Sequence, residues 1–594
     1  MTAVEKIKAL RTVMKARGVA ALVIPSTDPH QSETVGPRWR SREWLSGFTG
    51  SSGTLVITHS LAGLWTDGRY FIQAAAELKG SGIRLFKMRG PGVPTVNEWI
   101  AGRLKPGESV AFDGHVVSVE TVRGMEKAFS EKKLKLWCKE DLVSSVWADR
   151  PGYPCVPVYD FPVKFAGWSR ARKLATVRAT LREKNADALL LASLDDIAWL
   201  FNIRGRDIPH SPVVLAYALI EARKATLFVG VDKVPSVLRR AFHKAGVMLL
   251  PYESITSRLK ALPAASSLLL NPRRVNYTMK AALPKTVRLI EETPDITTEL
   301  KAVKNFVEQG HFRRAALVDG LALTRFFAWL DSSLAAGVTV TEYTAGLRLA
   351  AFRKEAPECR DDSFPAICAS GPNAAMIHYS ARAGTAALLR RHGLFLVDSG
   401  GNYFEGTMDT TRTVALGRVS EEARRGYTLV LKGLIALSRV RFPAGCTGTH
   451  LDALVRAPLW AHGLNYNHGS GHGVGAYLNV HEGPHGFTSA WNASAFKPGM
   501  VVTIEPGLYV QGRYGIRTEN MALVTEAGTT IHGEFLRFET LTVCPIDTAP
   551  LIPGLLAADE KAWLNDYHRT VWNKLSPLLN QEERRWLKKK TAAI

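Results

Sequence analysis

Five residues in the last third of the chain have the types and the spacing of a hydrolytic site that holds two metal ions. Their intervals are 11, 63, 33 and 14 residues, and they are Asp398, Asp409, His472, Glu505 and Glu519. Two divalent cations about 3.5–4 Å apart require oxygen-rich ligands, because carboxylates can bridge both ions and hold a shared hydroxide. Four carboxylates and one imidazole meet this requirement. The pattern predicts a dinuclear centre whose negative charge is nearly neutralised only when both ions are bound.

A histidine-rich segment surrounds one of these residues. His468, His472 and His481 lie within fourteen residues that also hold four glycines, and His378 lies upstream in GPNAAMIHYS. Glycine lets the backbone approach a ligand closely. A single histidine on an apolar face is most often a hydrogen-bonded core residue, but three at this glycine density indicate a site. His472 would bind a metal through a neutral ring nitrogen while its other nitrogen is held by an acceptor.

Each carboxylate taken alone could be a turn former or a surface residue at the end of a strand. Asp398 ends the apolar run GLFLVDSGG, and Asp409 lies past a turn in the next strand. Glu505 closes MVVTIEPG, and Glu519 lies in another strand, after a tight turn. If these side chains face the core, burial without a counter-charge would raise the pKa of each carboxyl group. Metal ligation is the simplest way to keep them ionised.

Composition indicates a globular protein of several domains. The chain has 594 residues, of which 46% are hydrophobic and 22% charged, so two to four domains are expected. Its six cysteines form no CxxC pair, which is typical of a reducing compartment. No apolar run approaches 18 residues and the N-terminus has no secretory pattern, so we expect a cytoplasmic protein without a membrane partner.

The net charge of +22 raises the possibility of nucleic-acid binding. The basic residues are scattered, however, and the only dense cluster is ERRWLKKK at 583–590. No recognised nucleic-acid-binding pattern accompanies it. A solvated basic surface is therefore favoured over a nucleic-acid partner.

The first half of the chain contains an internal repeat. The segment from Leu10 aligns without gaps on the segment from Val177, and WLSGFTG from Trp44 matches WLFNIRG from Trp199 in the same order. Between the repeats lies the proline-rich segment 149–162, which we expect neither to join a sheet nor to continue a helix. The repeat predicts two α/β domains of one fold, residues 1–150 and 151–300, each a mixed sheet with helices.

Residues 301–594 form the third predicted domain. It opens with a long helical pattern over Glu299–Trp329, and strands then alternate with helices to about residue 546. The apolar spacing of the tail, Asp559–Trp586, predicts helices that pack back onto this domain, with a break near Pro577.

Together the motifs resemble the aminopeptidase P family, the Xaa-Pro aminopeptidases of the pita-bread metallopeptidase fold. DSGG, DTTRT, HGSGHGVG, VHEGP, IEPG and GIRTEN carry the resemblance, and SREWLSGFTGSSGTLVIT, TDGRYFIQA, DDIAWLFNIRG and KAVKN extend it over nearly the whole chain. The resemblance is to the large, three-domain cytosolic form. It implies an α/β (α+β) protein with two duplicated creatinase-N-like domains followed by a pita-bread catalytic domain.

The resemblance also implies metal roles. Asp398 would bind one ion, Asp409 and Glu519 would bridge both, and His472 and Glu505 would complete the second. Manganese is the usual ion of the family, so two Mn²⁺ per subunit are expected, with Co²⁺ or Zn²⁺ as alternatives.

Further residues match the family's substrate site. His378, His468 and His481 match histidines that line it. Glu505 would be the catalytic residue that transfers the proton of the attacking water. Arg69, in DGRYF, matches a family position that contacts the peptide from the first domain.

The implied activity is release of the N-terminal residue from peptides with proline second, by a hydroxide that bridges the two metals. Proline-containing peptides are the expected partners, and family members commonly form homodimers through the catalytic domain. One alternative is a prolidase-like Xaa-Pro dipeptidase, which the duplicated N-terminal half argues against. Another is a non-catalytic peptide-binding protein on the same fold, which the five intact ligand positions argue against.

Overall fold

The computed structural model describes residues 1–594, which divide into two units. The first comprises residues 1–161 and 168–297, and the second comprises residues 162–167 and 298–594. None of the helices combines the length and apolarity that a membrane crossing requires.

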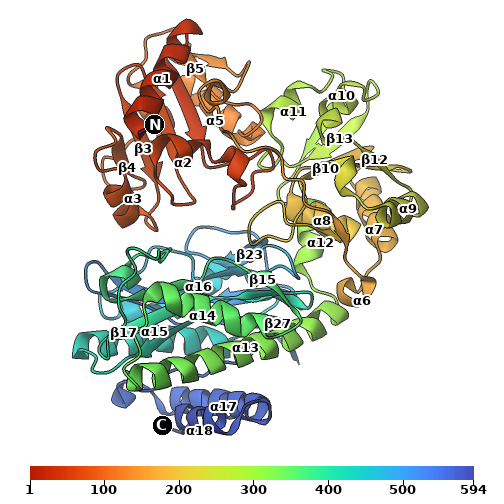
Figure 1. Ribbon diagram of the computed structural model, residues 1–594. Coiled ribbons are helices and arrows are strands. Elements are labelled where there is room, and N and C mark those ends of the chain that lie inside the picture. The colour runs from red at the N-terminus through yellow and green to blue at the C-terminus, as the bar shows by residue number, and fades with distance from the viewer. The chain divides into compact units, whose positions relative to one another are not determined.

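The first unit contains two six-stranded sheets with the same topology (Figure 1). In each sheet the first strand pairs antiparallel with the second and parallel with the strand on its other side. The strand orders are β4-β3-β2-β1-β5-β6 and β12-β11-β10-β8-β13-β14. The strands are β1 Ala21–Pro25, β2 Thr54–Thr58, β3 Ala62–Thr66, β4 Arg84–Lys87, β5 Ser109–Ala111, β6 Lys135–Trp137, β8 Ala188–Leu191, β10 Ala216–Glu221, β11 Ala225–Val229, β12 Val247–Leu250, β13 Ser267–Leu270 and β14 Arg288–Glu291.

Local sequence explains the helices that accompany these sheets. In α1 (Ala3–Ala16), Thr2 and Glu5 form a capping box, and the buried residues Ile7, Leu10 and Met14 make one apolar stripe. The other principal helices of the unit are α2 Ser41–Ser46, α3 Phe71–Glu77, α4 Val96–Ala101, α5 Val119–Phe129, α7 Arg170–Glu183, α8 Leu194–Phe201, α9 Ser236–Lys244, α10 Ile255–Lys260 and α11 Tyr277–Ala281. The prediction of a mixed-sheet α/β fold is confirmed, and the domain boundaries at 150 and 300 remain predictions.

The proline-rich segment is less isolated than predicted. β7 (Tyr159–Asp160) lies inside it and pairs antiparallel with β9 (Ile203–Arg204). The expectation that this segment joins no sheet is therefore wrong. The two paired residues precede Pro162 and follow Pro157, so both retain a backbone N–H for pairing.

The second unit contains two helix pairs, each packed on strands. α14 (Glu342–Lys354) lies beside α13 (Phe306–Ala335) and packs on the sheet β16-β17-β20. α15 (Glu421–Arg439) and α16 (Gly448–Trp460) pack on the sheet β21-β28-β27-β24-β22-β23. The strands of the unit are β15 Cys359–Asp362, β16 Ile367–Ser370, β17 Leu394–Ser399, β18 Gly401–Tyr403, β19 Gly406–Thr407, β20 Thr410–Ala415, β21 Arg441–Pro443, β22 Gly471–Gly473, β23 Glu482–Phe487, β24 Val501–Ile504, β25 Gly507–Val510, β26 Tyr514–Arg517, β27 Asn520–Thr530 and β28 Gly533–Thr540.

The predicted helix over Glu299–Trp329 is two helices. α12 (Ile296–Ala302) ends before Val303, which pairs with Met500, and α13 starts afresh after Asn305. The Asn305 side chain accepts hydrogen bonds from the first turn of α13, which makes it a cap that ends one helical pattern and begins the next.

The tail forms the two predicted helices, α17 (Ala558–Leu575) and α18 (Gln581–Lys590), separated by a short 3₁₀ turn that contains Pro577. Both contact α13 (Figure 1). Leu564, Val571 and Leu575 of α17 belong to an apolar core that they share with α15 and with strands β24 and β27. The tail is thus an integral part of the second unit.

Two glycines of α13 test how closely this helix is packed. A Cβ at Gly320 would lie 2.0 Å from the carbonyl oxygen of Val543, whereas a Cβ at Gly310 would meet nothing within 4 Å. Gly320→Ala should lower the free energy of unfolding by about 1–3 kcal/mol. Gly310→Ala should raise it by about 0.5–1 kcal/mol, because alanine favours helix. Denaturant unfolding of both variants checks this, and a stabilised Gly320→Ala would contradict the packing.

Candidate metal centre

The five predicted ligands lie in or next to strands of two sheets of the second unit, β16-β17-β20 and β21-β28-β27-β24-β22-β23. Asp398 lies in β17, opposite Thr411 of β20, and Asp409 directly precedes β20, not within the strand as predicted. His472 lies in β22, and Glu505 follows β24. Glu519 directly precedes β27, not within a strand as predicted.

Backbone pairing joins the two layers at this point. Ile504 pairs with Asn520, which places Glu505 beside Glu519. The Glu519 N–H donates to the Thr411 carbonyl oxygen at 3.1 Å. Five residues spread over more than one hundred positions therefore meet in one place.

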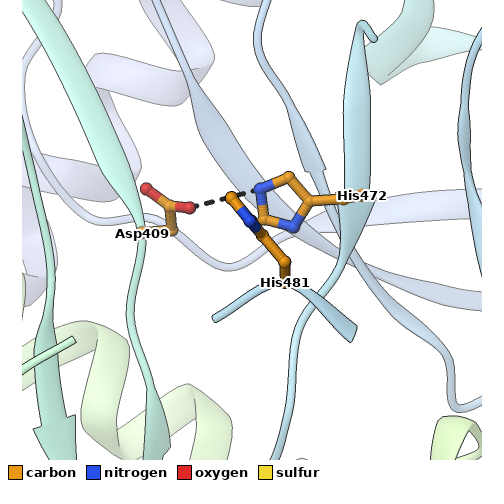
Figure 2. A group of neighbouring side chains, drawn as sticks. All are labelled: Asp409, His472 and His481. Carbon is orange, nitrogen blue, oxygen red and sulfur yellow. Dashed lines mark ion pairs between the residues drawn. The ribbon is translucent and has the colours of Figure 1, made fainter. Parts of the chain in front are cut away.

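The ligand atoms form three overlapping groups, in each of which they lie within 4.8 Å of one another. The groups are Asp398, Asp409 and Glu519; His472, Glu505 and Glu519; and Asp409, His472 and His481. Asp409, Glu519 and His472 each belong to two groups. Of these three, only the two carboxylates have a pair of oxygens with which to bridge two cations. Figure 2 shows Asp409 facing the His472 ring, with Oδ2 and Nε2 3.4 Å apart and the His481 ring against that of His472.

The carboxylates are held where a cation would stabilise them. Desolvation and the Asp398 carboxylate raise the pKa of Asp409 well above its usual range. Desolvation, Asp409 and Glu505 do the same for Glu519. Desolvation raises the pKa of Glu505 to about 7. Oδ1 of Asp398 is buried and has no hydrogen-bond partner. A buried carboxylate oxygen without a donor, within a cluster of this charge, fits the donor set of a divalent cation.

The His472 ring is oriented as a metal ligand requires. Its Nδ1 lies 2.9 Å from the Gly473 carbonyl oxygen, which can only accept a hydrogen bond, so Nδ1 carries the proton. The Nε2 lone pair therefore points toward Asp409 and Glu505, at 3.4 and 3.7 Å. A carbonyl that holds the distal ring nitrogen is the usual partner of a ligating histidine.

An arginine and a tyrosine that the motif analysis did not single out complete the site. Arg517 is buried, forms an ion pair with Asp398 and donates to the Tyr509 hydroxyl at 2.7 Å. The Tyr509 hydroxyl lies 3.0 Å from Nε2 of His468, and Nδ1 of His468 donates to the Gly469 carbonyl at 2.7 Å. Desolvation, and then Arg517, lower the pKa of His468 to about 3, so this ring is neutral. Arg517 stands within GIRTEN, two residues before Glu519, and this position was the only signal in the sequence.

A second buried arginine links the site to the tail. Arg412 donates to the Glu519 carbonyl oxygen at 2.6 Å and to the Tyr567 hydroxyl of α17 at 2.8 Å. Its other acceptors are neutral as well: the carbonyls of Thr411, Cys544 and Pro545 and the side chain of Asn520. Helix α17 thereby holds the guanidinium that supports the backbone of a predicted ligand.

The remaining predicted site residues lie at different distances from the cluster. His481 is in it, with its ring centroid 4.3 Å from that of His472. His468 is adjacent, with Nδ1 3.8 Å from the Glu505 carboxylate. His378 is close enough to His468 to contribute to lowering its pKa. Arg69 lies in the first unit, paired with Asp67 at 2.8 Å, and its role stays a prediction.

Family models match almost the whole chain. Residues 310–526 match the metallopeptidase family M24, and residues 534–594 match the C-terminal region of peptidase M24. Residues 6–136 and 149–308 each match a creatinase/prolidase N-terminal domain.

Full-length relatives show the same similarity. The chain is 38% identical to a probable Xaa-Pro aminopeptidase P of Laccaria bicolor, over 99% of this chain and 93% of the relative. It is 39% identical to one of Paracoccidioides lutzii, over 99% of both. Among solved structures, X-prolyl aminopeptidase from Caenorhabditis elegans, described as a cytosolic enzyme with a di-nuclear active site, matches with a TM-score of 0.96 and 33% identity over 100% of both chains.

The raised pKa of Glu505 predicts how the metal-free protein responds to pH. A carboxyl group whose pKa is higher in the folded state stabilises the fold below its unfolded value, 4.5, and this contribution is lost as pH rises through about 7. Chelator-treated protein should therefore lose roughly 1–3 kcal/mol from this group between about pH 4.5 and 8.

Thermal unfolding across this range, compared with Glu505→Gln, isolates the group, because the variant cannot titrate there. Asp409 and Glu519 act in the same direction in both proteins. Adding Mn²⁺ at the upper end of the range should restore stability. Identical pH dependence of the two proteins would show that the pKa of Glu505 is not raised in the folded protein.

Proposed function

The chain belongs to the aminopeptidase P family of M24 metallopeptidases, and on that premise we propose that it releases the N-terminal residue from peptides whose second residue is proline. The observation that carries the proposal is the overlap of the ligand groups at Asp409 and Glu519, which suits two cations. The Caenorhabditis elegans enzyme described as di-nuclear, similar over its whole length, supports both the activity and the number of ions.

Asp398, Asp409 and Glu519 would hold one cation, and His472 and Glu505 would complete the second with the same two bridging carboxylates. We propose manganese, since four carboxylates and one imidazole form the oxygen-rich donor set that this ion accepts. When bound, two such cations lower the pKa of a shared water and supply a hydroxide near neutral pH.

The protein's own groups then orient the peptide and move the proton. Glu505, which lies within reach of both the cluster and His468, accepts a proton from the attacking water and delivers it to the prolyl nitrogen, a role that positioned glutamates fill in general acid–base catalysis. His481, against His472, donates to the carbonyl oxygen as charge develops on it. Neutral His468, held by Tyr509 and Gly469, gives that side of the site a fixed shape without adding charge. His378, close to His468, would line the same substrate site.

Arg517 determines which oxygen of the Asp398 carboxylate is available to a cation. Its ion pair and its hydrogen bond to Tyr509 leave Asp398 one bound oxygen, Oδ2, and one without a donor, Oδ1. This division lets Oδ1 serve a cation while Oδ2 remains anchored to the protein. We also propose that the enzyme is cytoplasmic, as the Caenorhabditis elegans relative is described to be, and that it forms a homodimer through the catalytic domain.

Asp409→Asn should reduce both bound metal and activity, because a neutral amide is a poor bridge between two cations. We expect at least one ion per chain to be lost and kcat/KM to fall by at least roughly 10–100-fold, the range for losing a partner of a metal ligand. Elemental analysis and peptide hydrolysis with Mn²⁺ measure both. Asp566→Asn, on an exposed face of α17, is the control. Two ions and normal turnover in Asp409→Asn would exclude a bridging role.

Peptides of the type Ala-Pro-Ala should be cleaved on the order of 10²-fold better than Ala-Ala-Pro, measured as kcat/KM. Ring contacts are worth about 1–3 kcal/mol. The N–H that alanine reintroduces costs a further 1–3 kcal/mol, roughly, if no acceptor faces it. Comparing Ala-Pro with Ala-Pro-Ala-Ala separates a dipeptidase from an aminopeptidase. Equal rates for the two tripeptides would refute the proline preference but not the metallopeptidase activity.

A further inference from the structure

Three charged side chains form a buried ionic group beside the metal centre. Lys301 and Lys304 both pair with Glu482, Lys301 at 2.9 Å. All three side chains are at most 1% exposed. Two ammonium groups thus share one carboxylate out of contact with water, and Lys304 has a further acceptor in the Ala302 carbonyl at 3.3 Å.

Stability alone does not account for such a group. Transfer of each charge out of water costs several kcal/mol, and apolar side chains of similar volume often stabilise a protein equally well or better. We therefore ask which part of the backbone this ionic group holds in place.

Glu482 is linked through the backbone to both histidines of the cluster, His472 and His481. It directly follows His481, and its backbone pairs with Gly473, which directly follows His472. A Cβ on Gly473 would lie 2.3 Å from the Glu482 carbonyl oxygen, which shows how closely the two strands approach. Displacement of Glu482 would therefore move both histidines.

The strand pairing at this point is irregular, so the backbone ladder alone does not secure it. His472 pairs with Gly486, but the next residue, Gly473, pairs with Glu482. The residues in between bulge out of the β22–β23 ladder, and residues in a bulge are left without ladder pairing. His481 directly precedes β23, so a fixed Glu482 also fixes the point from which the His481 side chain extends toward His472, the arrangement in Figure 2.

We propose that Glu482 is a positioning residue, and that Lys301 and Lys304 clamp its carboxylate so that His481 stays against His472 and faces Asp409. The clamp deepens the proposed function and rests on it, since it assigns the catalytic effect to His481. Lys301 belongs to α12, and Lys304 follows it, with its N–H bonded to the Gly499 carbonyl at 2.9 Å. The junction between α12 and α13 is thus part of the site.

The test replaces the charged group by an apolar one in the manganese-loaded enzyme. Lys301→Met/Lys304→Met/Glu482→Met removes all three charges and keeps similar volumes. We expect unfolding temperature and metal content close to those of the wild type, but kcat lower by roughly 10–100-fold with little change in KM. A crystal structure should show the His481 ring displaced from His472.

Two further variants keep the result decisive. Lys301→Met keeps the Lys304–Glu482 pair, so it tests the clamp even if the triple variant fails to fold, and it should show a smaller fall in kcat. Lys590→Met is the matched control: this lysine is shared by Asp331 and Asp547 in the same unit, and its loss should leave kcat unchanged.

Wild-type kcat and an unmoved His481 ring in Lys301→Met and in the triple variant would overturn the clamp. Parallel loss of stability, metal and activity would also overturn it, because that result indicates a structural role only. If the wild type itself cleaves no Xaa-Pro peptide, the proposed function fails. The position of His481 in the variants then still decides whether the clamp exists.

Discussion

Mutual repulsion among four carboxylates is the constraint on which the rest of the second unit depends. Asp398, Asp409, Glu505 and Glu519 face one another where bulk water hardly reaches, and burial raises the pKa of the last three. An ionised cluster of this kind persists only opposite positive charge. The protein supplies one guanidinium directly, Arg517 on Asp398. Most of the compensation is left to bound cations, which couples folding stability to metal concentration.

Such repulsion can be sustained only by a rigid frame. The carboxylates stand in or beside strands, where ladder pairing holds the backbone, and strands of both layers join at the hydrogen bond from Glu519 to Thr411. The ladder is interrupted beside His472, and there the buried ion pairs of Glu482 with Lys301 and Lys304 hold the backbone. Rigidity therefore comes from backbone pairing where pairing is regular and from side chains where it is not.

Much of this organisation could be predicted from the sequence, because it resides in local patterns. The repeat predicted two sheets of one topology, and the motifs predicted which five residues meet. What could not be predicted depends on contacts between distant segments. The helix over Glu299–Trp329 is interrupted because Val303 pairs with Met500, which no helical periodicity reveals. In the sequence, Arg517 and Tyr509 look like ordinary strand residues. Only the fold brings Arg517 against Asp398 and Tyr509 against His468.

The contact between Arg412 and Tyr567 has a consequence for synthesis on the ribosome. Every proposed ligand precedes residue 520, but the hydroxyl that holds the Arg412 guanidinium belongs to α17, near the C-terminus. The metal-binding side chains of a nascent chain are therefore synthesised before the helix that supplies this hydroxyl. The hydrogen bonds of Arg412, which supports the Glu519 carbonyl, are complete only after α17 has been synthesised.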